Sequence, residues 1–111
     1  MNIEDNLNAD AIENAYPLVT IITVVQNNAD YIRDAIESVL SQTYPNVEYI
    51  VIDGDSTDGT ADIVKEYKHK ISTFISEPDE GIYDALNKGV KKANGYVIGI
   101  LHSDDLFSDN Q

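Results

Sequence analysis

Two short segments of the chain are rich in aspartate, a side chain that often holds hard divalent cations in proteins. The first is DGDSTDG, residues 53–59, and the second is HSDD, residues 102–105. Carboxylates in such a pattern could bind calcium, accept a phosphoryl group, or hold another ligand. The competing interpretation is structural, with a side chain of the first segment capping a helix and the glycines forming a tight turn.

An EF-hand calcium loop does not fit the first segment. A loop beginning at Asp53 would need glycine at its sixth position and a bidentate acid at its twelfth, but Asp58 and Val64 stand there. The residues before the segment, VEYIVI, also predict a strand, whereas an EF-hand loop follows a helix. We therefore expect no calcium site in this segment.

A phospho-acceptor pocket of the receiver-domain type is also disfavoured. Such a pocket uses aspartates at the ends of parallel strands, but the first predicted strand ends in the amides of Gln26 and Asn27. Helix capping by Asp58 explains the first segment alone and leaves Asp104 and Asp105 unexplained. Because both segments follow predicted strands, the sequence favours a ligand site.

The composition is that of one globular domain. Of 111 residues, 42% are hydrophobic and 24% charged, which is ordinary for a folded domain. The absence of cysteine excludes disulfides, thiolate metal sites and a cysteine nucleophile. The formal net charge of −13 opposes binding to nucleic acid or to an anionic membrane surface. An anionic ligand would therefore need a metal cation between itself and the carboxylates.

Residues 1–16 carry acidic side chains without Lys or Arg and contain no long apolar run. They do not have the pattern of a secretory signal, and no segment of the chain approaches the about 20 apolar residues of a membrane-spanning helix. We expect these residues to form an N-terminal arm. We expect a cytoplasmic protein, with peripheral membrane attachment as the alternative.

Apolar runs and helical periodicity alternate along the rest of the chain. Short β-branched runs predict buried strands, and the segments between them have the three-to-four-residue apolar spacing of helices. This order indicates a mainly parallel sheet between helical layers, a Rossmann-like α/β three-layer sandwich. Ligands of such sheets bind at the carboxyl ends of the strands, so the polar segments there should converge. The expected strands are 18–25, 47–52, 71–76 and 96–101, and the expected helices are 29–44, 60–67 and 82–93.

From residue 17 to the end, the chain resembles the N-terminal, nucleotide-sugar-binding half of family 2 glycosyltransferases, which have the GT-A fold. The resemblance rests on three segments in the family's order: VTIITVVQNN, SVLSQTYPNVEYIVIDGDSTDGT and SEPDEGIYDALNKGVKKANGYVIGILHSDD. It implies that residues 17–111 are the donor-binding part of a GT-A domain that ends after the metal-binding motif.

The resemblance implies an inverting transfer of a sugar from a nucleotide-diphosphate sugar, most commonly a UDP-sugar, to a carbohydrate or lipid-linked acceptor. It implies that Asp53 contacts the base and that Asp104 and Asp105 hold Mg²⁺ or Mn²⁺, which bridges the diphosphate. The alternative is a non-catalytic nucleotide- or metal-binding module of similar fold. The nucleotide-sugar contacts implied by the resemblance are Val25, Gln26, Asn27, Asp53, Asp84, Lys88 and Asp104.

Several of these assignments have a structural alternative. Asp84 and Lys88 lie on a predicted helix whose other face is apolar, so Lys88 could simply be solvated. Asp58 is expected to cap a helix, while Asp55 and His102 depart from the family pattern.

The family's general base lies in a later segment, so we expect it beyond Gln111. We therefore expect this chain alone to bind a nucleotide diphosphate with metal but to turn over poorly or not at all. We also expect an open edge at the fourth strand, which would favour a homodimer.

Overall fold

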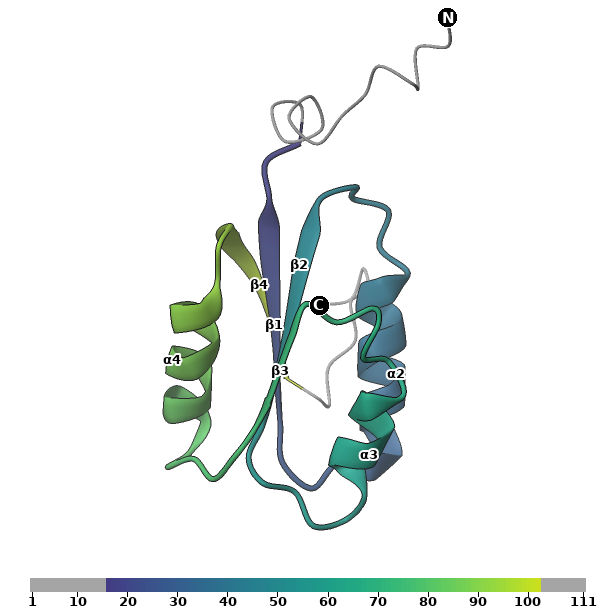
Figure 1. Ribbon diagram of the computed structural model, residues 1–111, viewed down its shortest axis with the longest axis vertical. Helices are drawn as coiled ribbons and strands as arrows, with labels where there is room; N and C mark the ends of the chain where they lie inside the picture. Colours follow the sequence, from purple (N-terminus) through teal and green to yellow (C-terminus); the bar gives the residue numbers. More distant parts are fainter. Residues whose placement is uncertain (1–15, 103–111) are drawn as a thin grey trace, which may run out of the picture.

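The structure of the protein is a computed structural model that describes residues 16–102, with side chains described as far as Tyr96. Helices and strands alternate along this part of the chain (Figure 1). The elements are β1 (Val19–Val25), α2 (Ala29–Leu40), β2 (Val47–Asp53), α3 (Thr60–Lys65), β3 (Thr73–Ser76), α4 (Ile82–Lys92) and β4 (Tyr96–His102).

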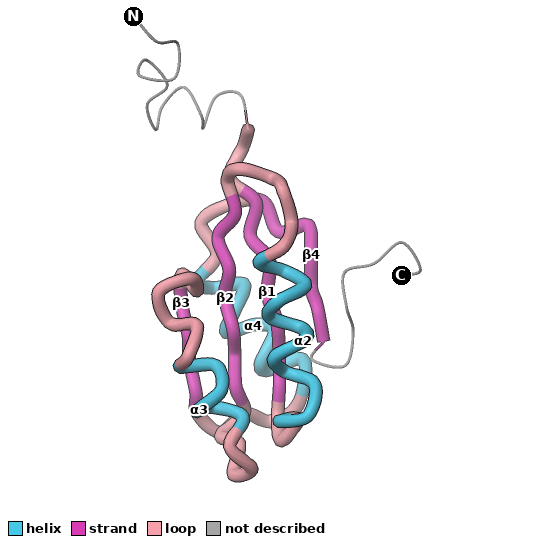
Figure 2. Tube along the Cα trace, turned by 90° about the vertical axis from the view of Figure 1, so that its right-hand side faces the viewer, coloured by secondary structure: helices cyan, strands magenta, loops and turns pink. Residues whose placement is uncertain are grey.

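The described strands form one parallel sheet in the order β3-β2-β1-β4. Figure 2 shows them side by side, with β4 next to β1 at one edge. Helix α4 covers one face of the sheet, whereas α2 and α3 cover the other (Figure 1). The predicted α/β three-layer architecture with a parallel sheet is therefore confirmed.

The two faces of the sheet build two apolar clusters because successive strand residues point to opposite sides. Along β1, Ile21 and Val25 pack with α2 and α3, whereas Ile22 and Val24 pack with α4. All seven residues of β1 are buried, which explains why its sequence is β-branched throughout and does not alternate between apolar and charged residues. Gly89 lets α4 approach the sheet closely, since a Cβ there would lie 2.8 Å from Cγ2 of Ile22.

Some predicted element boundaries were wrong. Helix α2 ends at Leu40 rather than near residue 44, because Ser41 and Gln42 close its last turn with backbone hydrogen bonds to Glu37 and Val39. Strand β3 begins at Thr73 rather than residue 71, since residues 66–70 form turns after α3.

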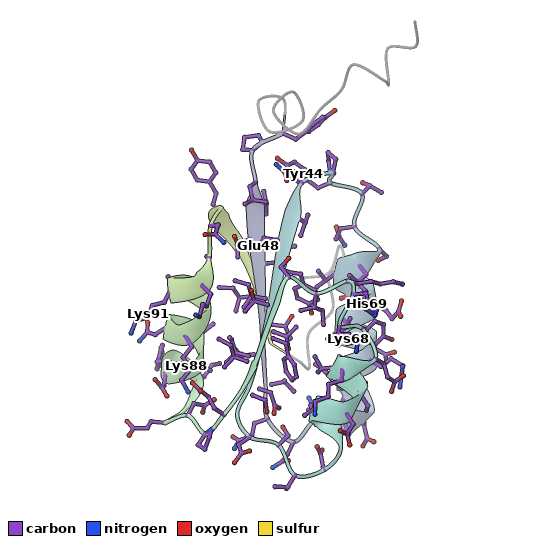
Figure 3. All side chains as sticks on the ribbon, viewed as in Figure 1. Tyr44, Glu48, Lys68, His69, Lys88 and Lys91 are labelled. Atoms are coloured by element: carbon purple, nitrogen blue, oxygen red, sulfur yellow. The ribbon has the colours of Figure 1, made fainter. Side chains whose placement is uncertain are left out.

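Glu48 lies on β2, near the amino ends of the strands (Figure 3). Its carboxylate is 9% exposed and accepts hydrogen bonds from Thr20 Oγ1 (2.7 Å), Asn94 N (2.8 Å) and Asn94 Nδ2 (2.7 Å). Burial opposes its ionisation, but the hydrogen bonds from Asn94 and Thr20 outweigh burial, so the pKa of Glu48 is below its ordinary value. The charged carboxylate therefore ties the turn between α4 and β4 to the sheet.

We expect Glu48→Gln to lower the free energy of unfolding at pH 7 by about 1 kcal/mol, because the amide NH₂ group cannot accept the hydrogen bond that Asn94 Nδ2 donates to the carboxylate. The depressed pKa means that the wild-type carboxylate stabilises the fold above the unfolded-state pKa of about 4.3 and loses this contribution as the pH falls through the folded-state value. The difference between variant and wild type should therefore shrink below pH 4.3. Urea unfolding at several pH values measures both effects.

The matched control is Glu80→Gln at an exposed glutamate, which should change the stability by less than about 0.5 kcal/mol. Equal stability of the Glu48→Gln variant and the wild type at pH 7 would contradict the assigned role of the carboxylate.

Candidate functional site

Three loops meet at the carboxyl ends of the strands. Residues 26–28 follow β1, residues 54–59 follow β2, and residues 77–81 follow β3. Backbone hydrogen bonds join them to the neighbouring strands, with Gly54 N donating to Val25 O (2.9 Å) and Glu77 N to Asp53 O (3.0 Å). The predicted convergence of the first two polar segments is thus confirmed.

Asp53 organises the second loop from inside the protein. Its side chain is fully buried, and its carboxylate accepts hydrogen bonds from Ser56 N (3.0 Å), from the Ser56 hydroxyl and from Ser76 Oγ (2.7 Å). The loop can turn back onto this carboxylate because Asp55 (φ 60°) and Gly59 (φ 94°) adopt left-handed backbone. Asp tolerates left-handed backbone better than most residues, and the Asp55 side chain is exposed.

Asn27 joins the first loop to the second. It adopts a left-handed backbone (φ 47°), and its Oδ1 accepts a hydrogen bond from Thr57 N (2.7 Å). Its own N–H donates to Ser56 Oγ (2.8 Å), and the next N–H, of Asn28, donates to Thr60 Oγ1 (3.1 Å). The Asn27 side chain therefore supports the neighbouring loop.

Asp58 connects the beginnings of two helices. Its carboxylate accepts Ala29 N of α2 (3.1 Å) and Thr60 N of α3 (3.0 Å), and it also bonds the Thr60 hydroxyl. The bond from the Thr60 hydroxyl, reinforced by these backbone donors against the effect of burial, lowers the pKa of Asp58. The predicted capping by Asp58 is confirmed, because its carboxylate accepts the first N–H of α3. Asn28 occupies the N-cap position of α2 without a side-chain capping bond, and the Asp58 carboxylate accepts the first N–H of that helix as well.

A pocket of about 100 Å³ opens between the first loop, the third loop and the start of α4. Its lining includes two of the predicted contact residues, Val25 and Gln26. Backbone and apolar side chains form most of its wall, with one amide and one carboxylate. The lining residues are Val24, Val25, Gln26, Asp79, Gly81, Ile82 and Ala85.

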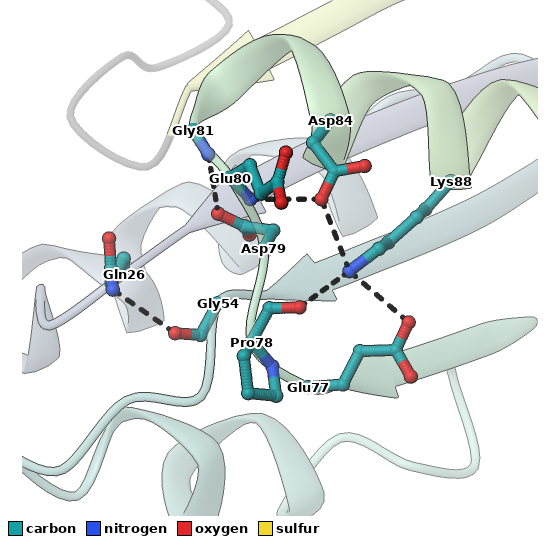
Figure 4. A network of polar contacts seen from close by, with 9 residues as sticks. All are labelled: Gln26, Gly54, Glu77, Pro78, Asp79, Glu80, Gly81, Asp84 and Lys88. Carbon is teal, nitrogen blue, oxygen red and sulfur yellow. Dashed lines mark hydrogen bonds and ion pairs between the residues drawn. The ribbon is translucent and has the colours of Figure 1, made fainter.

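Gln26 and Asp79 form the polar wall of this pocket, and both lie next to Gly54 (Figure 4). Gln26 Nε2 donates to Gly54 O (3.1 Å), and Asp79 Oδ1 accepts Gly81 N (3.1 Å). A Cβ on Gly54 would lie 2.8 Å from Asp79 Oδ2 and 3.4 Å from Gln26 Cδ. Only a residue without a side chain leaves the amide and the carboxylate this close together.

Sequence reasoning missed Asp79, because the segment EPDEG was interpreted only as a turn. The available signal was its position directly after a predicted strand, at the same edge as the other polar segments.

Asp84 and Lys88 contact the third loop from α4 (Figure 4). Lys88 Nζ donates to Pro78 O (2.8 Å) and forms ion pairs with Glu77 (3.2 Å) and Asp84 (3.6 Å). Asp84 Oδ2 also accepts Glu80 N (2.9 Å). The implied contacts of Asp84 and Lys88 with a donor stay predictions, and the contacts seen here are with the protein's own loop.

The expected metal residues, Asp104 and Asp105, lie outside the described residues. Within the part of the chain that the structure describes, no three His, Asp or Glu side chains gather closely enough to hold a metal ion. Strand β4 ends at His102, whose backbone lies in register with Val24. The chain therefore leaves β4 at the same edge of the sheet as the pocket.

No helix of the described region has both the length and the apolar character needed to cross a membrane.

Comparisons with known protein families identify glycosyltransferases over most of the chain. A family model described as glycosyl transferase family 2 matches residues 20–111. The chain is 44% identical over 100 residues to an uncharacterized glycosyltransferase of Rickettsia typhi, covering 89% of this chain and 31% of that protein. It is 39% identical over 93 residues to an uncharacterized glycosyltransferase of Mycobacterium tuberculosis, covering 83% of this chain and 36% of that protein. The chain thus spans about a third of the length of these relatives.

Solved structures with the same fold include two with bound nucleotide sugars. The mannosyltransferase PcManGT from Pyrobaculum calidifontis, in complex with GDP-Man and Mn²⁺, is 30% identical with a TM-score of 0.73, over 82% of this chain and 28% of that chain. TarS of S. aureus, in complex with UDP-GlcNAc, is 29% identical with a TM-score of 0.72, over 80% of this chain and 27% of that chain.

Proposed function

Since the chain belongs to glycosyltransferase family 2, we propose that it is the donor-binding part of an inverting enzyme that transfers a sugar from a nucleotide-diphosphate sugar to an acceptor. The observation that carries this proposal is the pocket at the carboxyl edge of the sheet, where one amide and one carboxylate meet over Gly54. Ligands of open α/β sheets bind at this edge.

The pocket is proposed to hold the base of the nucleotide. The carboxylate of Asp79 can accept a hydrogen bond from an imide N–H, and the amide of Gln26 can donate to the adjacent carbonyl oxygen. Uracil and guanine present this N–H beside a carbonyl, whereas cytosine and adenine present an unprotonated ring nitrogen that would face the carboxylate. Uridine is our first choice, because the resemblance implies a UDP-sugar.

The other predicted contact residues take two roles in this proposal. Val25 lies beside the base. Asn27 and Asp53 hold the loops that border the base, and Asp53 adjoins the base site. Asp84 and Lys88 lie on the side of the third loop that faces away from Gln26. In this proposal they would contact the sugar or the phosphates of the donor. Figure 4 shows this separation between Gln26 and Lys88.

The diphosphate is proposed to bind through Mg²⁺ or Mn²⁺ held by Asp104 and Asp105. The described strand β4 leads to this edge, and carboxylates are the hard oxygen ligands that both cations prefer. A cation is required on physical grounds, since a chain of net charge −13 would otherwise repel a diphosphate. When bound, the metal would stabilise the departing diphosphate as the glycosidic bond breaks.

Nucleotide titration tests the proposed function. The chain is titrated with UDP, GDP, CDP, ADP and inorganic pyrophosphate in Mn²⁺ buffer by calorimetry. UDP or GDP should bind at least about tenfold more tightly than CDP and ADP, a difference of about 1.4 kcal/mol. Equal binding of all five compounds would refute a base site and favour the alternative, a non-catalytic metal-binding module.

Gly54→Ala should weaken UDP binding by at least about tenfold without unfolding the protein, because the new Cβ would displace the Asp79 carboxylate from the pocket wall. Calorimetry measures the affinity, and thermal unfolding measures the stability.

The matched control is Gly59→Ala in the same loop. A Cβ there meets open space, but the backbone has φ +94°, so the variant should lose about 1 kcal/mol of stability while keeping its UDP affinity. An unchanged UDP affinity of Gly54→Ala would contradict the proposed pocket.

The proposal extends to features that depend on the whole protein. The acceptor is a carbohydrate or lipid-linked molecule, and the location is cytoplasmic with peripheral membrane attachment as the alternative. Strand β4 lies at the edge of the described sheet and is proposed to support a homodimer. Sedimentation of the chain as a monomer at high concentration would refute the dimer.

A further inference from the structure

The loop of residues 77–81 carries Asp79 to the pocket, and its conformation decides where the carboxylate lies. The loop begins at Glu77, whose N–H bonds Asp53 O (3.0 Å) at the end of β2. It ends at Gly81, which has φ +114°, a conformation that favours glycine. The three residues between these ends need further anchors to hold one carboxylate in place.

Lys88 supplies these anchors from the second turn of α4. Its ammonium group contacts the Pro78 carbonyl and the carboxylates of Glu77 and Asp84. Its side chain is 20% exposed, compared with 54% for Glu77. An ammonium group has three donors. Pro78 O (2.8 Å) and Glu77 (3.2 Å) lie within hydrogen-bond distance of it, and Asp84 (3.6 Å) adds an ion pair.

Asp84 adds a second link to the same loop. Its Oδ2 accepts Glu80 N (2.9 Å) and also faces Lys88 Nζ (3.6 Å). Residues on both sides of Asp79 are thus held by α4, while Asp79 itself projects toward Gln26 and Gly54 on the opposite side of the loop (Figure 4).

The surrounding charges keep Lys88 protonated. Partial burial lowers its pKa, but the hydrogen bond with Glu77 and the charges of Asp84, Glu77 and Asp79 outweigh burial and raise it. The contacts therefore persist throughout the neutral pH range.

We infer that Lys88 is a positioning residue for base recognition, which clamps loop 77–81 to α4 and thereby keeps the Asp79 carboxylate at the pocket wall. This inference rests on the proposed nucleotide site. It differs from a direct contact of Lys88 with the donor's phosphates, because a positioning residue affects a ligand that has no phosphate.

Lys88→Met tests the clamp, because methionine keeps the apolar stem and removes the ammonium group. Uridine and UDP are titrated in Mn²⁺ buffer by NMR, and amide exchange is measured at Glu80. The variant should lose about tenfold in affinity for uridine and for UDP alike. The ratio of its affinities for UDP and CDP should be smaller than in the wild type. The Glu80 amide proton should also exchange with solvent faster than in the wild type. Lys88→Arg, which restores a charged donor, should recover most of each loss.

Lys91→Met is the matched control, since Lys91 is an exposed lysine on the same helix (Figure 3). It removes one positive charge and should leave the uridine affinity and the Glu80 exchange rate unchanged.

Three results would decide against the inference. A loss of UDP affinity without a loss of uridine affinity in Lys88→Met would mean that Lys88 contacts the phosphates. An unchanged Glu80 exchange rate would mean that Lys88 does not clamp the loop. If Lys88→Met accelerates exchange but changes neither affinity, the clamp does not serve base recognition. Failure of the wild type to bind either ligand would instead refute the nucleotide site, and the exchange rate would still decide whether the clamp exists.

Discussion

Asp53→Ala is expected to lower the free energy of unfolding by about 3 kcal/mol, because hydrogen bonds to charged groups contribute about 1.5–3 kcal/mol each and are not additive. The substitution removes the acceptor for Ser56 N, the Ser56 hydroxyl and Ser76 Oγ. The Asp53 side chain is fully buried, whereas Ser56 is half-buried and Ser76 is exposed, so water offsets only part of the loss. Urea unfolding followed by circular dichroism measures the change.

Two further variants separate the carboxylate's role from a general effect of the loop. Asp53→Asn should recover part of the stability, because an amide oxygen can still accept Ser56 N–H while the hydroxyls reorient toward its NH₂ group. Asp55→Gly removes an exposed carboxylate at φ 60° and should change the stability by less than about 0.5 kcal/mol. If Asp53→Ala were as stable as Asp55→Gly, the buried network would not hold the loop.

The second large effect concerns the divalent cation. Chelation should weaken UDP binding by about 100-fold or more, because a diphosphate would then face carboxylates without a bridging charge. The affinity for uridine, which has no phosphate, should stay the same. Calorimetry with and without EDTA measures the difference, and Asp104→Ala combined with Asp105→Ala should reproduce it in the presence of Mn²⁺.

The control for this double variant is Asp109→Ala, which also removes an acidic side chain but lies outside the HSDD segment. It should bind UDP as the wild type does. Undiminished UDP binding in EDTA would refute the metal-bridged diphosphate, whereas loss of uridine binding in the double variant would indicate that it had misfolded.

Changes at the proposed base site and at the proposed metal site are therefore expected to alter different affinities. Gly54→Ala and Lys88→Met should act on uridine as strongly as on UDP, since both variants change the wall of the base pocket. Metal removal should act on UDP alone. The ratio of the two affinities assigns each variant to one site without a crystal of the complex.

The family match covers most of this chain but only part of the length of its relatives. The relatives are about three times as long as this chain, so the described residues correspond to one part of those proteins. Their pocket, loops and strand ends suffice to test donor recognition. The acceptor and the general base belong to the proposal for the whole protein.

The parallel direction of the strands and their alternation with helices followed from the sequence alone. Runs such as VTIITVV are β-branched at every position and mostly apolar, and burial on both faces of a sheet accounts for that pattern. Short helical segments between them allow parallel pairing with right-handed crossovers. The same reasoning predicted the carboxyl edge as the binding edge, and the pocket lies at that edge.

Element boundaries depended on contacts that no local pattern reveals. Residue 71 has the β-branched character of a strand, but β3 begins at Thr73, where its pairing with Ile50 of β2 begins. Helix α2 likewise ends before the proline that was expected to stop it. In both places pairing and turn hydrogen bonds overrode intrinsic propensity.

The sequence by itself placed the segments after β1 and β2 at the carboxyl edge of the sheet, because their positions along the chain relative to the strands suffice for that. Only the tertiary structure decided which polar side chains line the pocket and which face one another. Asn27 and Asp53 turn toward Thr57, Ser56 and Ser76, while Asp79 turns toward the pocket. The physical reason is that a hydrogen-bonding side chain takes whichever partner the fold brings near, and those partners lie as many as 30 residues away along the chain.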